Sequence, residues 1–117
     1  MVRIKRVYEP VEKEDGSRYL VERLWPRGVS QSSLHMTAWV KEVAPSPELR
    51  KWYQHDVSKW ADFRRRYWRE LNIHPDACRP LLEASRKGDV TLLFSARDVK
   101  HNSALILKSY LERRLKH

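Results

Sequence analysis

Residues that can bind an anion are concentrated in the segment RLWPRG, residues 23–28. Two guanidinium groups, Arg23 and Arg27, stand on either side of Trp25, and the segment ends on Gly28. Guanidinium groups can bind phosphate or carboxylate oxygens in a bidentate manner. An indole can stack on a base or ring, and a glycine lets the backbone approach a ligand closely. The segment therefore predicts part of a binding site for an anion.

A second segment, SARDVKHN, follows an apolar run and leads into the last predicted helix. Its candidate ligand-binding residues are Ser95, Arg97 and Asn102. Asp98 and His101 are the candidate catalytic residues, because an imidazole with a pKa near 6.5 can act as a general acid or base. If the two segments meet, Arg23, Arg27 and Arg97 can converge on one phosphate or carboxylate, assisted by the N–H groups of the helix start.

Structural roles are alternative explanations for the same residues. Asp98 can be an N-cap of the last helix, and Asn102 or Ser103 can share that role. Trp25 can have a structural role, in which its side chain packs in the core and fixes the bend of the chain at this point. Arg23 can form an internal ion pair with Glu22 or Asp98. A lone histidine at a helix start is more often structural than catalytic, so these alternatives stay open at this stage.

No metal or cofactor site is predicted. His74 and Cys78 are four residues apart in a predicted helix, but no second pair of ligands accompanies them. The chain has 3 glycines, so it cannot form a glycine-rich phosphate loop. Any anion site must therefore be built from arginines and a helix end.

The hydrophobic pattern predicts an α/β fold, with a small mixed sheet of about four strands packed with about four helices. Strands are expected at 2–8, 18–25, 38–44 and 90–94, and helices at 47–53, 59–71, 75–87 and 103–115. The apolar run at 90–94 does not alternate, which indicates the central strand of the sheet. The short connection between the first two strands predicts that they are antiparallel. The two candidate segments both follow strands, where ligands of α/β proteins gather.

The helix at 59–71 has two contrasting faces. Trp60, Phe63, Tyr67 and Leu71 recur at helical spacing and are expected to face the core. Arg65, Arg66 and Arg69 fall on the other side. With the arginines near the C-terminus, they form a candidate surface for nucleic acid, whose phosphates such a face binds without sequence preference.

Composition narrows the class of protein. The 117 residues carry a formal net charge of +9, which favours anionic partners, either small molecules or nucleic acid. No apolar stretch approaches the roughly 20 residues that span a bilayer, so no membrane partner is expected. The single cysteine cannot form an internal disulfide, and the cytoplasm is the expected location. The oligomeric state is left open.

Four stretches resemble, in order and spacing, the YeaO-like family of small bacterial proteins, a domain of unknown function. They are KRVYEP…DGSRYLVERLWPRGVS, WVKEVAPSPELRKW, FRRRYWREL and VTLLFSARDVKHNSALILKSYL, and LVERLWPRG is the most specific motif among them. The resemblance covers nearly the whole chain and implies one YeaO-like domain over residues 1–117, in a bacterial cytoplasmic α/β protein. It implies no established activity.

The chain departs from its relatives at three positions. The family pattern usually has an aspartate where this chain has Glu22, and another where it has Thr37. If the second aspartate is catalytic in the family, this protein lacks it. More distant relatives carry a cysteine where this chain has Ser95, so their thiol chemistry is not transferred here.

The sequence thus favours a protein that binds a nucleotide or phosphorylated metabolite at the two segments, and that is an enzyme only if Asp98 or His101 moves protons. The alternatives are a nucleic-acid-binding module and a protein-interaction domain without chemistry.

Overall fold

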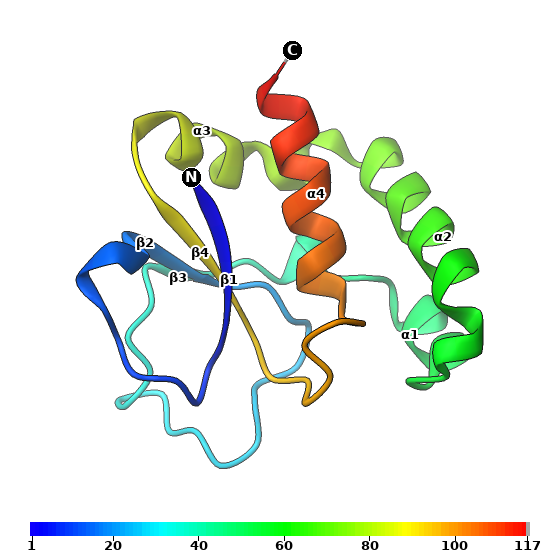
Figure 1. Ribbon diagram of the computed structural model, residues 1–117, viewed down its shortest axis with the longest axis horizontal. Helices are drawn as coiled ribbons and strands as arrows, with labels where there is room; N and C mark the ends of the chain where they lie inside the picture. The colour runs from blue at the N-terminus through cyan, green and yellow to red at the C-terminus, as the bar shows by residue number, and fades with distance from the viewer. Residues whose placement is uncertain (117) are drawn as a thin grey trace.

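The computed structural model describes residues 1–116, and its sheet has four strands in the spatial order β1-β4-β2-β3 (Figure 1). Their bounds are Val2–Arg6 for β1, Ser17–Leu20 for β2, Ala38–Trp39 for β3 and Val90–Phe94 for β4. All five residues of β4 are buried. A continuous apolar run suits a strand that has neighbours on both sides and packed side chains on both faces. The predicted central strand is therefore confirmed.

The predicted antiparallel pairing of the first two strands is wrong, and so is the mixed sheet that followed from it. β1 and β2 do not pair with each other: each pairs in parallel with β4, and β3 pairs in parallel with β2. The ten residues 7–16 carry the chain back past one intervening strand, with a short 3-10 helix at Lys13–Asp15. That intervening strand comes from the far end of the chain, so no local pattern could reveal it. The α/β class, with four strands and four helices in one domain, is confirmed.

A buried ion network attaches this return segment to the sheet. The Asp15 carboxylate accepts hydrogen bonds from Lys5 Nζ at 3.1 Å and from the Arg18 guanidinium. The Thr91 hydroxyl, on β4, donates to the Asp15 carbonyl at 2.7 Å. Gly16 follows with a φ of 63°, and a Cβ there would lie 2.2 Å from the Asp89 carbonyl oxygen. Only glycine fits this close approach.

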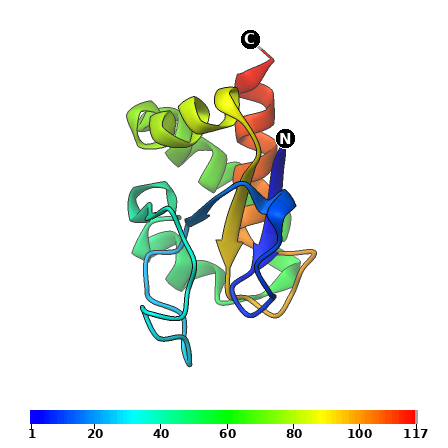
Figure 2. The same ribbon diagram turned by 90° about the vertical axis from the view of Figure 1, so that its left-hand side faces the viewer.

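The four helices pack on one face of the sheet. Their bounds are Pro47–Tyr53 for α1, Trp60–Ile73 for α2, Arg79–Lys87 for α3 and Ser103–Leu115 for α4. Val90, Leu92 and Phe94 of β4 share one buried cluster with apolar side chains of all four helices. On the opposite face, Leu20 and Leu93 pack with residues of the loops. Figure 1 shows the helices above and to the right of the sheet, and Figure 2 views the molecule from the side of those loops.

Predicted element bounds agree best where a capping signal is strong. α1 and α4 match the predicted helices at both ends, and Ser46 caps α1 by accepting a hydrogen bond from the Leu49 N–H. The predicted helix at 75–87 is divided into a 3-10 turn, Pro75–Cys78, and α3. Pro80 lacks an N–H and therefore sits in the first turn of α3.

The second and third strands are shorter than predicted. β2 ends at Leu20 and β3 spans two residues, after which the chain turns into a 3-10 helix at Lys41–Val43. Within residues 1–116, no helix is both long and apolar enough to cross a membrane.

Candidate anion-binding cleft

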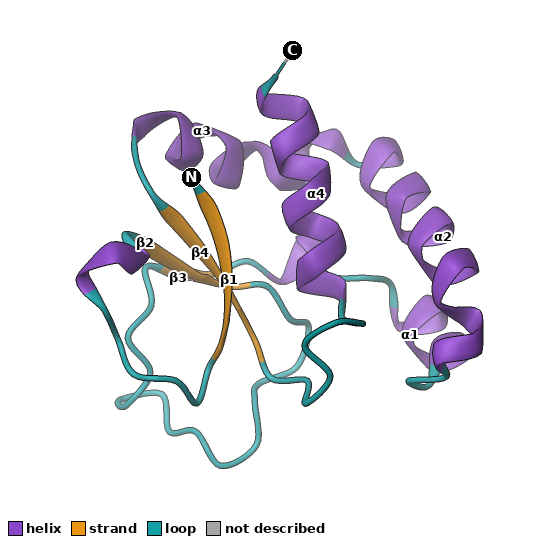
Figure 3. Cartoon of the chain, viewed as in Figure 1, coloured by secondary structure: helices purple, strands orange, loops and turns teal. Residues whose placement is uncertain are grey.

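Residues 23–27 of RLWPRG and residues 95–97, 101 and 102 of SARDVKHN line one cleft of about 890 Å³. Gly28 and Asp98, which were also predicted for the site, are not among the residues that line it. The two segments follow β2 and β4 at the carboxyl edge of the sheet, where the strands lead into long loops (Figure 3). The Ser95 hydroxyl donates to the Glu22 carboxylate at 2.7 Å, which joins the two loops directly. The expectation that the two segments meet is therefore confirmed, although the ligand-binding and catalytic roles of their residues remain predictions.

Charge is distributed unevenly around this cleft. The cationic side chains that line it are Arg6, Arg23, Arg27, Arg50, Lys51 and Arg97. Among the described lining residues, the one carboxylate is that of Glu22, which already accepts the hydrogen bond from Ser95. Cationic side chains at the mouth of a low-dielectric cleft raise the local concentration of anions.

Two of the six cations have structural roles. Arg6 donates through Nε to the Ala96 carbonyl at 3.0 Å and through a terminal nitrogen to the Ser95 carbonyl at 3.2 Å. Arg23 donates to the carbonyls of Ala44 and Pro45, at 3.1 and 3.3 Å. Of the alternatives considered for Arg23, the ion pair with Glu22 or Asp98 is not observed. Its guanidinium holds the segment before α1 against the end of β2.

The other four cations are exposed at the cleft. Across residues 1–116, the side chains of Arg27, Arg50, Lys51 and Arg97 form no ion pair and no hydrogen bond. Sequence reasoning identified Arg27 and Arg97 but missed Arg50 and Lys51, because charged residues in a short helix such as α1 are typical of any solvated surface. Only the packing of α1 beside the strand ends brings them to the cleft.

The loop before α4 is shaped by Asp98. One Asp98 carboxylate oxygen accepts from the Lys100 and His101 N–H groups at 2.9 and 3.0 Å, and the other lies 3.0 Å from His101 Nδ1. The hydrogen bond from the Lys100 N–H, followed by those from His101, lowers the pKa of Asp98. Asn102 is the N-cap of α4, since its Oδ1 accepts from the Leu105 N–H. The capping role suggested for Asp98 thus belongs to Asn102.

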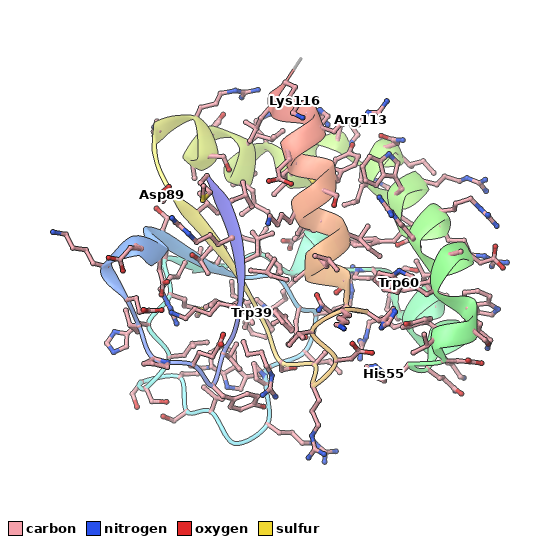
Figure 4. The ribbon with its side chains drawn as sticks, in the orientation of Figure 1. Trp39, His55, Trp60, Asp89, Arg113 and Lys116 are labelled. Atoms are coloured by element: carbon pink, nitrogen blue, oxygen red, sulfur yellow. The ribbon has the colours of Figure 1, made fainter. Side chains whose placement is uncertain are left out.

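Trp25 is mainly a packing residue. Its ring meets that of Trp39 edge-to-face at 5.3 Å, and its indole N–H donates to the Val29 carbonyl. Trp39, the last residue of β3, is labelled in Figure 4. Gly28 has a φ of 72°, and nothing lies within 4 Å of where its Cβ would be. Its backbone conformation, rather than a close approach, therefore explains the glycine.

Tyr53 is a further residue of the cleft that sequence reasoning missed, besides Arg50 and Lys51. It ends α1, lines the cleft and is 6% exposed, and its ring stacks on Phe63 at 4.2 Å. Its hydroxyl is buried and has no hydrogen-bond partner within the described chain. Burial raises the pKa of this hydroxyl, and the nearby carboxylates of Asp98 and Asp56 raise it further. No sequence signal separates such a tyrosine from an ordinary core residue.

The two faces of α2 are as predicted. Phe63, Tyr67 and Leu71 are buried in the core, with Trp60 packed against them. Arg65, Arg66 and Arg69 are exposed. Arg65 forms an ion pair with Asp62, and the Arg66 guanidinium lies 4.3 Å from the centre of the Trp52 ring.

Cys78 is a core residue. It is fully buried, and burial raises the pKa of its thiol to about 11, so the thiolate needed for metal binding is disfavoured. His74 is exposed at the end of α2. In the part of the chain that the structure describes, no three His, Cys, Asp or Glu side chains are grouped to hold a metal ion.

The molecule is therefore a small parallel α/β domain with a cation-lined cleft at the carboxyl edge of its sheet. Residues 1–117 match the family model DUF488-N3i, described as the inactive DUF488-N3 subclade, and the chain belongs to this family. The chain is 43% identical over 110 residues to the uncharacterized protein YeaO of Escherichia coli, covering 94% of this chain and 96% of YeaO. The YeaO-like resemblance is thereby confirmed.

Mycobacterial relatives extend the comparison. The uncharacterized proteins Rv3073c of Mycobacterium tuberculosis and Mb3100c of Mycobacterium bovis are each 37% identical over 113 residues, covering 97% of this chain and 95% of theirs. No solved structure gives a significant match.

The three departures from the family pattern fall in different surroundings. Glu22 and Ser95 are hydrogen-bonded to each other in the cleft. Thr37 is not among the residues that line the cleft; its hydroxyl accepts a hydrogen bond from the Arg18 N–H at 3.2 Å. A threonine at position 37 therefore leaves the walls of the cleft unchanged.

Proposed function

We propose that this protein binds an anionic small molecule, a nucleotide or phosphorylated metabolite, in the cleft at the carboxyl edge of its sheet, and that it does so in the bacterial cytoplasm. The observation that carries the proposal is the charge imbalance. Arg27, Arg50, Lys51 and Arg97 line the cleft without ion pairs in residues 1–116, and the one lining carboxylate, Glu22, is already hydrogen-bonded. Such cations are available for charge-assisted hydrogen bonds to a phosphate.

The start of α4 supports the same ligand class. Asn102 and Ser103, its N-cap and first residue, both line the cleft. The first N–H groups of a helix of this length have no intrahelical partners and carry the positive end of the helix dipole. The Asn102 side chain accepts a hydrogen bond from the Leu105 N–H. The N–H groups that precede Leu105 in the first turn can therefore bind an anion.

We propose binding without chemical turnover. The family is described as inactive. The Asp98 carboxylate, a candidate catalytic group, is held by two backbone N–H groups and by His101, an arrangement that stabilises a turn. The Ser95 hydroxyl donates its hydrogen bond to the Glu22 carboxylate and not to a histidine. Ser95 therefore lacks the adjacent imidazole base that activates the nucleophile in a Ser–His pair.

Isothermal titration calorimetry with inorganic phosphate, ribose 5-phosphate and the nucleoside monophosphates AMP, GMP, CMP and UMP tests the proposal. We expect at least one phosphate ester to bind. Arg27→Ala combined with Arg97→Ala should weaken that binding by about a hundredfold or more, because it removes two charged hydrogen bonds and each is worth about 1.5–3 kcal/mol. The free energy of unfolding of the double variant should lie within about 0.5 kcal/mol of the wild-type value, because substitutions at exposed positions usually change it by no more than that.

Arg65→Ala is the matched control, because Arg65 is an exposed arginine on α2 that does not line the cleft. It should bind like the wild type. If the wild type binds none of these compounds, or if the double variant binds them unchanged, the proposed function is wrong.

The basic face of α2 supports a second candidate, a nucleic-acid-binding surface. Arg66 and Arg69 are exposed on this helix, three residues apart, and the Arg66 guanidinium lies over the half-buried ring of Trp52. Anisotropy of a labelled oligonucleotide, measured at low and near-physiological salt, separates the candidates. Binding that falls in Arg66→Ala combined with Arg69→Ala, but not in the cleft variant, would favour the nucleic-acid surface over the cleft.

A further inference from the structure

The cleft at the carboxyl edge of the sheet carries more positive charge than one phosphate group balances. Six cationic side chains line it, and among the described lining residues the one carboxylate is that of Glu22. A phosphate monoester brings a charge of about −1.5 to −2 at neutral pH, and a second phosphoryl group brings about as much again. The excess of cations therefore fits a ligand with two phosphoryl groups better than it fits a monoester.

The four cations without ion pairs come from three different elements. Arg27 lies in the loop after β2 and Arg97 in the loop after β4, whereas Arg50 and Lys51 belong to α1. Figure 1 shows α1 to the right of the strand ends from which these loops leave. Adjacent residues of a helix do not face each other, so Arg50 and Lys51 do not act as one pair. The free cations are thus spread over three elements of the wall.

The size of the cleft supports the same ligand class. Its volume of about 890 Å³ lies within the range of roughly 300–1,000 Å³ that is typical of sites for whole organic ligands. A charge-assisted hydrogen bond spans only about 2.7–2.9 Å. Cations spread over the walls of a cleft of this size therefore do not all contact one phosphate group. A second phosphoryl group supplies acceptor oxygens for the cations that the first group leaves without a partner.

The two arginines with structural roles add to the excess of positive charge. Arg6 and Arg23 each donate two hydrogen bonds to backbone carbonyls, which are uncharged. These hydrogen bonds fix the position of the guanidinium groups and do not neutralise them. The charge of Arg6 and Arg23 therefore still contributes to the positive potential in the cleft.

We propose that the ligand of the cleft carries at least two phosphoryl groups, as a diphosphate or a bisphosphate, and that Arg50 and Lys51 of α1 are needed to bind the additional group. A monophosphate binds in the same cleft more weakly, because it leaves part of the cationic wall without a partner. This inference rests on the proposed function, since it specifies the class of ligand for the same cleft.

Calorimetry with matched pairs of ligands tests the inference. The pairs are AMP with ADP, and fructose 6-phosphate with fructose 1,6-bisphosphate, titrated without divalent cations, which would neutralise the phosphates. Within each pair the two compounds share one organic scaffold and differ by one phosphoryl group. We expect the second group to raise the affinity by about tenfold or more in at least one pair, because it adds at least one charge-assisted hydrogen bond.

Arg50→Ala combined with Lys51→Ala is the variant that isolates the contribution of α1. Two of the four free cations remain in it, enough for one phosphoryl group. The variant should therefore bind the monophosphate nearly as wild type does. Its preference for the doubly phosphorylated compound should fall to about threefold or less, the range expected when only solvated charges interact.

Arg86→Ala combined with Lys87→Ala, on α3, is the matched control. Both pairs consist of an exposed arginine and an exposed lysine in the last turn of a helix, but Arg86 and Lys87 do not line the cleft. The control variant therefore loses the same net charge and the same interaction with a helix dipole. It should keep the wild-type preference for the second phosphoryl group, and thermal unfolding checks that both variants remain folded.

The outcomes distinguish this inference from the proposed function. If the monophosphates bind wild type as tightly as their doubly phosphorylated partners in both pairs, the inference is wrong and the anion site remains. A preference that persists in the Arg50 and Lys51 variant, or that the control variant loses equally, would mean that the net charge of the protein and not the cleft causes it, and would also overturn the inference. If wild type binds none of the four compounds, both proposals are wrong.

Discussion

Charged side chains are concentrated in two regions of this sheet, and they are paired with one another in the first region and unpaired in the second. Lys5 of β1 and Arg18 of β2 both donate hydrogen bonds to Asp15 of the return segment, and the Asp15 and Arg18 side chains are 5% and 6% exposed. At the carboxyl edge, Arg27 and Arg97 are exposed and have no ion pair within the described residues. The first region is a closed network, and the second is open to a ligand.

The difference teaches that net charge alone does not locate a binding site. Both regions contain arginine or lysine, but only the network balances these charges with Asp15 and Glu12. Buried charges must be paired, because an unpaired charge loses its hydration without compensation. Cations at the cleft keep their hydration and can exchange it for an anion. The pairing of the charges, rather than their number, separates structure from candidate function.

The largest expected loss of stability comes from removing the carboxylate at the centre of the network. Asp15→Ala leaves Lys5 and Arg18 without their shared partner in a buried position, and we expect it to lower the free energy of unfolding by about 3–5 kcal/mol, measured by urea denaturation. Asp62→Ala is the matched control, since its ion pair with Arg65 is exposed on α2, and it should cost less than about 1 kcal/mol. Equal losses in the two variants would remove the distinction between the regions.

A smaller effect is expected at the two glycines with positive φ. Gly16→Ala combines a left-handed conformation with a Cβ 2.2 Å from the Asp89 carbonyl oxygen, and we expect a loss of about 2–4 kcal/mol. Gly28→Ala, beside the cleft, has a similar φ but open space around it, and should lose only about 1–2 kcal/mol. Thermal or urea unfolding of both variants checks this. A Gly28 variant as unstable as the Gly16 variant would mean that the RLWPRG loop is packed as tightly as the network.

The smallest effect is a pH dependence of stability to which Asp15 of the network should contribute. Burial by itself would raise the pKa of Asp15, but hydrogen bonds from the Glu12 N–H, Lys5 and Arg18 outweigh burial and lower it. The carboxylate therefore stabilises the fold fully above its unfolded pKa of about 4, and this contribution is lost as the pH falls through the lower folded pKa. Urea unfolding from about pH 6 to about pH 2 should show this loss in wild type and a shallower dependence in Asp15→Asn. An unchanged slope would place the acid sensitivity elsewhere.

Local signals in the sequence predicted most elements of this fold. Ser46 before Pro47 marked the start of α1, and the unbroken apolar run at 90–94 marked the central strand. The parallel arrangement could not be predicted in the same way. The length of the 7–16 connection suggested a hairpin, and the strand that intervenes lies some seventy residues further along the chain.

The candidate site was predicted in part. Arg27 and Arg97 stood out because they flank strand ends, where α/β proteins bind ligands. Arg23 also stood out, but its guanidinium is engaged by the Ala44 and Pro45 carbonyls. Tyr53 was not identified, because in a sequence a buried tyrosine with a satisfied hydroxyl and one without look identical.

The sequence by itself determined where the helices and the central strand lie, because capping residues and hydrophobic periodicity act over a few neighbouring residues. Only the tertiary structure decided that β4 separates β1 from β2, that the loops after β2 and β4 meet at the Glu22–Ser95 hydrogen bond, and that residues of α1 line the same cleft. These contacts join residues far apart in the chain. They depend on which apolar faces pack together, and local propensity carries no information about that choice.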